Sequence, residues 1–197
     1  TGFAFLGMGE DWHPIAGMDG MVALASIYVP LDGMNEKGLC VSDLIEIDGS
    51  TEVPDTDRAD LTIVAAIRLV LDYAKDTEEA VKLLSEYDVF PSVNAAHHLA
   101  ISDINNHNVV VEWKNGQMRV TETDIVTNHC LAENLQSPLT GESLRRFASL
   151  AQKHSGFKSH EEGLQALQDA SYEEETLWSV IYDKENLSST IYFDCDW

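Results

Sequence analysis

The sequence is poor in basic residues, and this scarcity excludes several classes of partner. Its 197 residues include 12 Lys and Arg against 34 Asp and Glu, a formal net charge of −22. Nucleic-acid binding depends on cations that displace counterions from phosphates, so we expect no nucleic-acid partner. The same charge disfavours anionic membrane surfaces, and no apolar run approaches the roughly 20 residues needed to span a bilayer. We therefore expect no membrane partner either.

Cysteine is also scarce, and its spacing fits neither a disulfide framework nor a zinc site. Cys40, Cys130 and Cys195 are odd in number and far apart. This pattern favours a reducing compartment and hence the cytoplasm. Neither a His-x-x-x-His run nor paired cysteines supply the spacing of metal ligands, so we expect no metal and no cofactor.

Internal repeats and low-complexity segments are lacking, which excludes repeat architectures and linkers. Hydrophobic residues make up 44% and charged residues 23%, values typical of a globular chain. The length suffices for one sizeable core. We therefore predict a single domain over 1–197.

What is present is a series of strand and helix patterns. Two β-forming runs, 27–29 and 39–41, flank a segment with turn residues at 32–33 and 35–38. Further strands are predicted at 2–9, 41–47, 97–103, 109–113, 118–120, 124–127, 176–183 and 189–193, and a loop at 48–60. Helices are predicted at 61–74, from Asp76 or Thr77 as cap, at 143–154 and at 161–170. This order predicts an α+β fold of antiparallel sheets with helices outside.

The motif around the first turn also carries a resemblance. The run DGMNEKGL at 32–39, preceded by LGMG at 6–9 and followed by VTN at 126–128, resembles the choloylglycine hydrolase family of linear amide C–N hydrolases. Bile salt hydrolase and penicillin V acylase belong to this family. The resemblance covers nearly the whole chain in order. It implies the N-terminal nucleophile hydrolase fold, an αββα sandwich, and cleavage of an amide between an acyl group and an amine as small-molecule substrate.

The family nucleophile is a cysteine at the mature N-terminus, on a strand that would precede Thr1. We therefore expect that the chain lacks its first strands, that a separate segment carries the cysteine, and that the chain alone is inactive. Threonine can also act as an N-terminal nucleophile, but the resemblance places 2–9 well beyond the nucleophile. Cys40 and Cys130 stand near the motifs, yet neither has an α-amine to serve as base. A small buried hydrophobe is the expected role of each.

The resemblance implies three site residues. Asn128 matches the asparagine whose amide helps to form the oxyanion hole, although alone it would read as a turn residue. Ile45 falls where the family uses a backbone N–H, although bile salt hydrolases carry a polar side chain there and a core strand residue is the alternative. Arg146 falls near the arginine that supports the nucleophile, with Arg145 as the neighbouring candidate and a solvated helix surface as the alternative for both.

Other polar residues are expected to be structural. His97 and His98 begin a strand, where alternation turns one inward as a core imidazole rather than a ligand. Trp12 and His13 could line a pocket mouth. A sheet without its first strands exposes an edge, which favours a homo-oligomer. The alternative function is a non-catalytic remnant that binds an acyl ligand or a protein partner.

Overall fold

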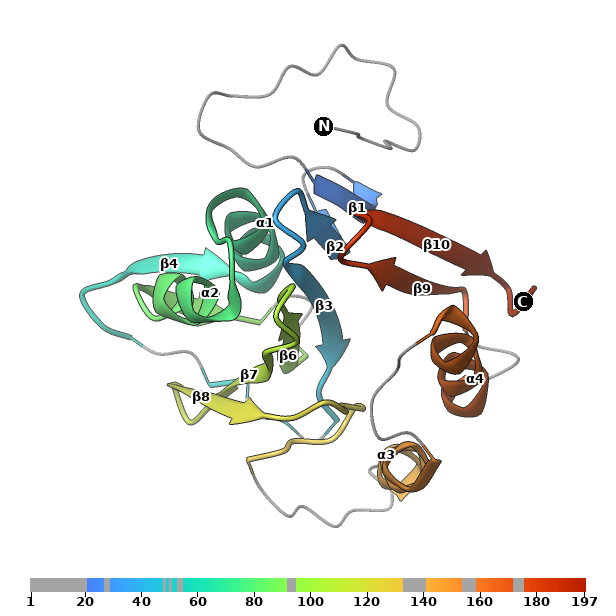
Figure 1. Cartoon of the computed structure of the whole chain (residues 1–197). Helices are drawn as coiled ribbons and strands as arrows, with labels where there is room; N and C mark the ends of the chain where they lie inside the picture. The colour runs from blue at the N-terminus through green and yellow to red at the C-terminus, as the bar shows by residue number, and fades with distance from the viewer. Residues whose placement is uncertain are drawn as a thin grey trace.

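A computed structural model describes residues 21–26, 29–47, 49, 51–52, 55–91, 95–132, 141–153, 159–171 and 176–197. The predicted strand at 2–9, Thr1, Trp12 and His13 lie outside these residues. The largest element is a six-stranded antiparallel sheet, ordered β1-β2-β3-β6-β7-β8 (Figure 1). Its strands are β1 (Met21–Ser26), β2 (Val29–Asn35), β3 (Cys40–Ile45), β6 (His97–Ser102), β7 (Asn108–Lys114) and β8 (Gln117–Glu122).

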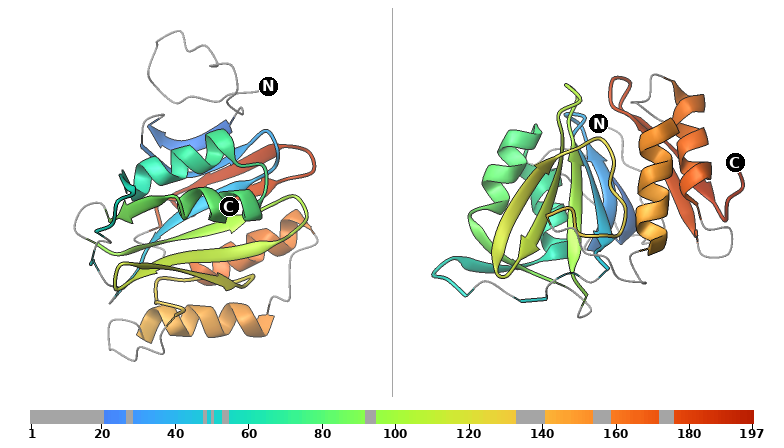
Figure 2. Two further views of the ribbon diagram at one scale, coloured as in Figure 1. Left: turned by 90° about the vertical axis from the view of Figure 1, so that its left-hand side faces the viewer. Right: turned by 90° about the horizontal axis from the view of Figure 1, so that it is seen from below.

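Two helices, α1 (Ile63–Tyr73) and α2 (Thr77–Leu84), cover one face of this sheet (Figure 2). Alternate strand residues point toward them because side chains in a strand have a period of two. The shared core holds Leu39, Val41, Leu99, Ile101, Val109 and Val111 from the sheet and Ile63, Ile67, Val70, Leu71 and Leu84 from the helices. None of the helices in the described residues is long and apolar enough to cross a membrane.

The two helices begin at side-chain caps. The Thr62 hydroxyl accepts from Ala65 N, and the Asp76 carboxylate accepts from Glu79 N, which confirms Asp76 as the predicted cap. Residues 59–62 are not helical, contrary to the prediction of a helix from 61. They form β4 (Ala59–Thr62), which pairs in parallel with β5 (Tyr87–Phe90) beside α1. The apolar pattern predicted helix at residue 61 because Leu61 packs against the same core as α1, but it does so from a strand.

The first motif forms a tight turn, shorter than predicted. Residues 32–33 belong to β2, and the turn comprises 36–38, with Gly38 at a positive φ of 77°. The buried Asn35 organises it: Oδ1 accepts from Lys37 N at 3.0 Å and Leu39 N at 3.1 Å. Asn35 Nδ2 donates to the carbonyls of Leu71 and Ala74 at the end of α1. One amide thus ties the turn to the helix layer.

The opposite face of the sheet carries the C-terminal elements (Figure 2): α3 (Gly141–Lys153), α4 (His160–Ala170), β9 (Trp178–Asp183) and β10 (Ser188–Phe193). β9 and β10 pair as an antiparallel hairpin, as predicted.

Two side chains tie this hairpin to the sheet. Tyr182 Oη donates to Asp32 Oδ1 at 2.7 Å, and Lys184 Nζ donates to Ser102 Oγ at 2.7 Å. Helix α4 packs on β9, and α3 packs on α4. The order of layers is therefore helices, sheet, hairpin and helices, the αββα arrangement that the family resemblance implied.

Candidate functional site

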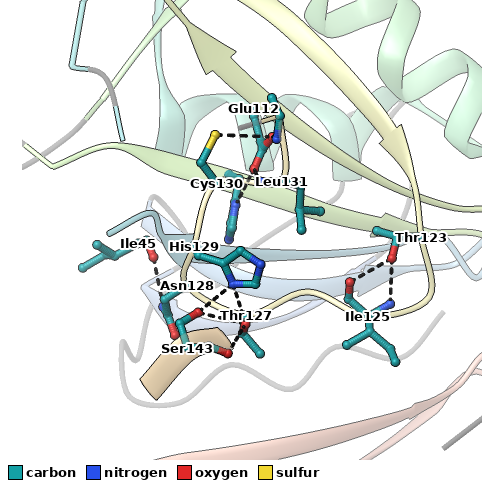
Figure 3. Close-up of polar contacts among 12 residues, drawn as sticks. Ile45, Glu112, Thr123, Ile125, Thr127, Asn128, His129, Cys130, Leu131 and Ser143 are labelled. Atoms are coloured by element: carbon teal, nitrogen blue, oxygen red, sulfur yellow. Dashed lines mark hydrogen bonds and ion pairs between the residues drawn. The ribbon is translucent and has the colours of Figure 1, made fainter. Parts of the chain in front are cut away.

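The predicted site residues Ile45, Asn128 and Arg146 come from three separate segments that meet at the end of β3. Figure 3 shows Ile45 and Asn128 beside each other. Asn128 lies in residues 123–132, which are not the strand predicted at 124–127. Their only regular pairing among the described residues is an isolated bridge of His129 with Ile47. The Thr123 hydroxyl explains the difference, since it accepts from Ile125 N and donates to Ile125 O, and this local turn breaks the strand.

The Asn128 amide is held at both ends. Its Nδ2 donates to Ile45 O at 2.9 Å, and its Oδ1 accepts from Arg146 Nη2 at 2.8 Å. A guanidinium bound to the amide oxygen draws electron density from the nitrogen, so both N–H groups become stronger donors. The amide nitrogen carries two hydrogens, and Ile45 O takes one of them. The arrangement therefore orients the second N–H.

Strand geometry directs the Ile45 N–H toward the side of β3 where Asn128 lies. Glu46 N donates to Ala96 O, on the β6 side of the strand. Because backbone groups alternate along an antiparallel strand, Ile45 directs its N–H and C=O away from β6, to the side where Asn128 lies. The Ile45 side chain is 51% exposed, which rules out the alternative of a core strand residue.

The structure distinguishes the two arginines of α3. Arg145 is exposed and forms an ion pair with Glu142. Arg146 is half-buried and contacts Asn128, because consecutive helical residues lie about 100° apart around the axis. Arg146, the candidate that the sequence favoured, is thus the one that faces the site.

A hydroxyl and imidazole network that the sequence did not predict fixes this helix to the Asn128 segment. Thr127 Oγ1 donates to Ser143 O at 3.0 Å, and Ser143 Oγ donates to Thr127 Oγ1 at 2.9 Å. His129 Nδ1 lies 3.1 and 3.0 Å from these two hydroxyl oxygens. Since both hydroxyl protons are used, Nδ1 carries the ring hydrogen. Burial lowers the pKa of His129, and the nearby Arg146 guanidinium lowers it further, which favours this neutral form.

Glu112 supports the other side of the Asn128 segment. Its carboxylate accepts from Leu131 N at 2.7 Å, from Ala132 N at 3.0 Å and from His98 Nδ1 at 3.2 Å. Burial by itself raises the pKa of Glu112, but these hydrogen bonds outweigh it, so the pKa lies below its usual value. Glu112 therefore acts as an anionic anchor for the backbone just after Asn128.

Both neighbouring histidines are buried, so the prediction that only one points inward was wrong. Alternation does turn them to opposite faces, but helices cover one face and the C-terminal elements cover the other. His97 Nδ1 lies 3.0 Å from Asp43 Oδ1, and His98 lies against Glu112. Each imidazole thus has a carboxylate partner.

The cysteines are not suited to act as nucleophiles beside Asn128 Nδ2 and the Ile45 N–H, which we call the donor pair. Cys40 and Cys130 are buried, and burial raises the pKa of each thiol to about 12. A thiol with so high a pKa is protonated at neutral pH and is a poor nucleophile. Both therefore fit the small buried hydrophobe predicted for them better than a nucleophile. Cys195 is half-buried near the C-terminus.

The layered α+β fold is the αββα fold of the N-terminal nucleophile hydrolases. Residues 20–195 match the family described as acyl-coenzyme A:6-aminopenicillanic acid acyl-transferase. The chain therefore belongs to this family. A comparison with curated proteins finds no match.

Solved structures agree on the fold. A mutant of conjugated bile acid hydrolase from Clostridium perfringens superposes with a TM-score of 0.61 at 15% identity, over 84% of this chain and 69% of that one. A second variant of the same hydrolase gives 0.53 at 16%, over 73% and 60%. Penicillin V acylase from Agrobacterium tumefaciens gives 0.58 at 20%, over 85% and 63%. The chain thus spans 60 to 69% of the length of these proteins.

Proposed function

We propose that Asn128 Nδ2 and the Ile45 N–H form the oxyanion hole of an enzyme that cleaves linear amides between an acyl group and an amine. Such a reaction passes through a tetrahedral intermediate whose negative oxygen needs preorganised donors. The observation that carries the proposal is the hydrogen-bonded series from Arg146 through Asn128 to Ile45. It aims one amide N–H and one backbone N–H at the same edge of β3.

Arg146 is the positioning residue in this proposal. Its bond to Asn128 Oδ1 fixes which end of the amide faces Ile45, so the nitrogen remains the donor. Its charge also favours the oxyanion over the neutral substrate. Because hydrogen bonds within the protein already hold the Asn128 amide, the proposed hole needs little reorganisation during the reaction.

The nucleophile in this proposal is an N-terminal cysteine supplied from outside this chain, whose α-amine takes the thiol proton. The sulfur bonds to the carbonyl carbon, the C–N bond breaks, and the amine leaves with a proton. The resulting thioester is then attacked by water, which is hydrolysis, or by a second amine, which is acyl transfer. Conjugated bile acids and penicillin V, named for the structural neighbours, are the first substrates to test.

A second candidate is a protein that binds an acyl ligand and does not cleave it. One observation favours it: burial raises the pKa of both buried thiols, Cys40 and Cys130, to about 12, so neither supplies a thiolate beside Asn128 and Ile45 at neutral pH. The donor pair would then hold a carbonyl or carboxylate oxygen of the ligand. Turnover by the natural protein separates the two candidates.

The test begins with the intact mass and N-terminal sequence of the protein as the natural source makes it. Its release of amine from penicillin V and from a glycine-conjugated bile acid is then measured, beside that of the 197-residue chain. We expect turnover by a natural form that begins with cysteine and none by this chain. Asn128→Ala in the natural form is expected to lower kcat about 10²–10³-fold.

Arg145→Ala is the matched control, since Arg145 is exposed on the same helix and is expected to leave kcat unchanged. An Asn128→Ala variant that keeps full kcat would contradict the oxyanion role. Turnover by the 197-residue chain that disappears in Thr1→Ala would assign the nucleophile to Thr1 instead. Ligand binding by a natural form without turnover would establish the second candidate.

A further inference from the structure

Three buried side chains lie between the two segments that carry the donor pair. Glu46 directly follows Ile45, Cys130 comes two residues after Asn128, and Glu112 lies in β7. The exposed fractions of Glu46, Glu112 and Cys130 are 4%, 1% and 1%. A carboxyl oxygen of Glu46 lies within 4.8 Å of one of Glu112. Two acidic groups are rarely buried so close together, because charged groups are costly to remove from water.

Glu112 is the ionised member of this acidic pair. Its carboxylate accepts hydrogen bonds from Leu131 N, Ala132 N and His98 Nδ1. These donors hold the pKa of Glu112 below its usual value although burial by itself raises it. The negative charge of the pair is therefore already present on Glu112.

The surroundings of Glu46 favour its neutral form instead. An added Cβ at Gly49 would lie 2.6 Å from Glu46 Oε1, so the backbone of residue 49 covers the carboxyl and excludes water from that side. Burial raises the pKa of Glu46, and the neighbouring Glu112 anion raises it further. A hydrogen bond with the Cys130 thiol lowers this pKa, as do two other neighbours, His98 in β6 and Lys114 in β7. These opposing effects do not outweigh burial.

The Cys130 thiol connects the two carboxyl groups. Its Sγ lies 4.0 Å from Glu112 Oε2 (Figure 3). Burial raises the pKa of Cys130 to about 12, so the thiol keeps its hydrogen at neutral pH. One S–H hydrogen cannot serve two carboxylates. With a proton on Glu46, the groups instead form a series in which Glu46 donates to Sγ and the thiol donates to Glu112.

We propose that protonated Glu46 is a positioning residue for the donor pair and acts through Cys130 and Glu112. The inference rests on the proposed function, in which the donor pair forms the oxyanion hole. One end of the series is bonded in sequence to Ile45, and the other end holds the backbone just after Asn128. The series therefore fixes the separation of the two donors.

Ionisation of Glu46 breaks this series. It removes the hydrogen that Glu46 donates, and it places a second anion within 4.8 Å of Glu112 in the protein interior. Like charges repel strongly where water is excluded, so the two segments are driven apart. Amide cleavage should therefore decline as pH rises through the pKa of Glu46. An α-amine that acts as base gives the opposite trend, because it must first lose its proton, so the two effects are distinguishable.

The first test uses the 197-residue chain and needs no turnover. Infrared difference spectra between the unsubstituted chain and Glu46→Gln isolate the Glu46 carboxyl, because Asp32 and the other acids are present in both. We expect a protonated carboxyl band that persists well above the ordinary glutamate pKa of 4.5. Amide exchange at Ile47, whose N–H donates to Asn128 O at 2.6 Å, reports the junction between the segments. We expect its protection to fall about 10-fold as Glu46 ionises and to stay constant in Glu46→Gln.

The second test measures amide cleavage by the natural form that begins with cysteine. Glu46→Gln keeps a neutral donor in place of the protonated carboxyl, so we expect it to retain kcat and to lose the decline at high pH. Glu46→Leu removes the donor, and we expect kcat to fall about 10- to 100-fold with KM unchanged. Glu122→Gln, at an exposed carboxylate of β8, is the matched control and is expected to keep the original pH profile.

Three results would overturn the inference: a Glu46 band that disappears near pH 4.5, Ile47 protection that is the same in both proteins at every pH, or a folded Glu46→Gln enzyme that loses as much kcat as Glu46→Leu. Circular dichroism establishes folding, and if Glu46→Leu does not fold, the pH profile of Glu46→Gln decides. If the infrared and exchange results are as expected but the natural form shows no turnover, the coupling of the two segments stands and the proposed function is rejected.

Discussion

At the scale of single residues, the side chains of α3 near Asn128 differ sharply in role. Arg146 binds the Asn128 amide and is half-buried, whereas Arg145 lies in solvent with Glu142. A hydrogen bond from a charged donor to a neutral acceptor contributes about 1.5–3 kcal/mol, and an exposed ion pair contributes much less.

We therefore expect Arg146→Ala to lower the free energy of unfolding by about 1.5–3 kcal/mol and Arg145→Ala to change it by less than about 0.5 kcal/mol. Urea unfolding followed by circular dichroism measures both. Equal losses in the two variants would show that the Arg146 to Asn128 bond is not a strong one.

A second residue-scale prediction concerns Asp32, whose burial raises its pKa to about 6 despite hydrogen bonds from Tyr182 and Ser42. The folded state then holds a proton that the unfolded state releases above its ordinary value of 3.8. The contribution of Asp32 to stability is therefore complete below the unfolded pKa and is lost as pH rises through about 6.

Asp32→Asn keeps an acceptor for Tyr182 and removes this loss. We expect the variant to gain stability over the unsubstituted protein as pH rises from about 4 to 7, by up to about 3 kcal/mol. Urea unfolding at several pH values measures the difference. His129, whose lowered pKa acts in the opposite sense, is present in both proteins and cancels. Parallel pH profiles would exclude a raised pKa at Asp32.

The motifs of the family resemblance predicted Asn128, Ile45 and Arg146 as site residues, but no other residue of the site. Asn128 follows a short recognisable run, and counting along β3 gave Ile45. His129, Ser143 and Glu112 were missed because their roles arise from contacts between segments far apart in the chain. Glu112 follows three consecutive valines, a pattern that indicates only a strand. Its partners, Leu131 N and Ala132 N, are backbone groups that leave no signal in the sequence.

At the scale of elements, the junction between α3 and the Asn128 segment rests on a few buried hydroxyls. Ser143 Oγ donates to Thr127 Oγ1 and lies 3.0 Å from His129 Nδ1. Ser143→Ala leaves these buried polar atoms short of a partner. We expect it to lower the free energy of unfolding by about 1–3 kcal/mol and to increase amide exchange in residues 127–129.

Hydrogen exchange by mass spectrometry measures this local effect, and Ser149→Ala, on the same helix, is the control. An exchange pattern at 127–129 identical to that of the unsubstituted protein would show that Ser143 does not hold the segment. In that case the bond from Thr127 Oγ1 to Ser143 O would be the sufficient link.

The turn at 36–38 gives a second prediction at this scale. Asn35 satisfies two backbone N–H groups of the turn and two carbonyls at the end of α1, all from one buried side chain. Asn35→Ala is expected to cost at least about 2 kcal/mol of unfolding free energy, because it leaves buried groups unpaired. Asn186→Ala, at an exposed turn, is expected to cost less than about 0.5 kcal/mol. Similar urea midpoints for the two variants would contradict the role of Asn35.

Element types followed the sequence wherever periodicity and caps agreed. Helix α2 begins at its predicted cap, and β6, β7, β9 and β10 lie where alternation placed them. The wrong predictions lie where a particular contact, rather than the sequence pattern, determines the secondary structure. β4 could not be predicted because its pairing partner β5 lies beyond two helices, and residues 124–127 had a strand pattern that the Thr123 turn interrupts.

At the scale of the whole molecule, the net charge and the exposed apolar surface have opposite effects on association between copies of the chain. Trp178 and Phe193 are a cross-strand pair in the β9–β10 hairpin, with exposed fractions of 37% and 53%, and the neighbouring Leu177 is 63% exposed. Apolar side chains grouped at a strand pair favour association between copies. A net charge of −22 on every copy resists it.

Salt screens this repulsion over about 8–10 Å at physiological ionic strength and leaves apolar attraction intact. We therefore expect self-association to grow as salt is raised, with light scattering at low salt giving a mass near 21.8 kDa and at high salt a larger one. Phe193→Asp should abolish the increase, because it places a charge at the centre of the apolar group. Ile104→Asp, at a residue 46% exposed in the β6–β7 turn, should not. A monomer at every salt concentration would show that this hairpin surface does not bind a second copy.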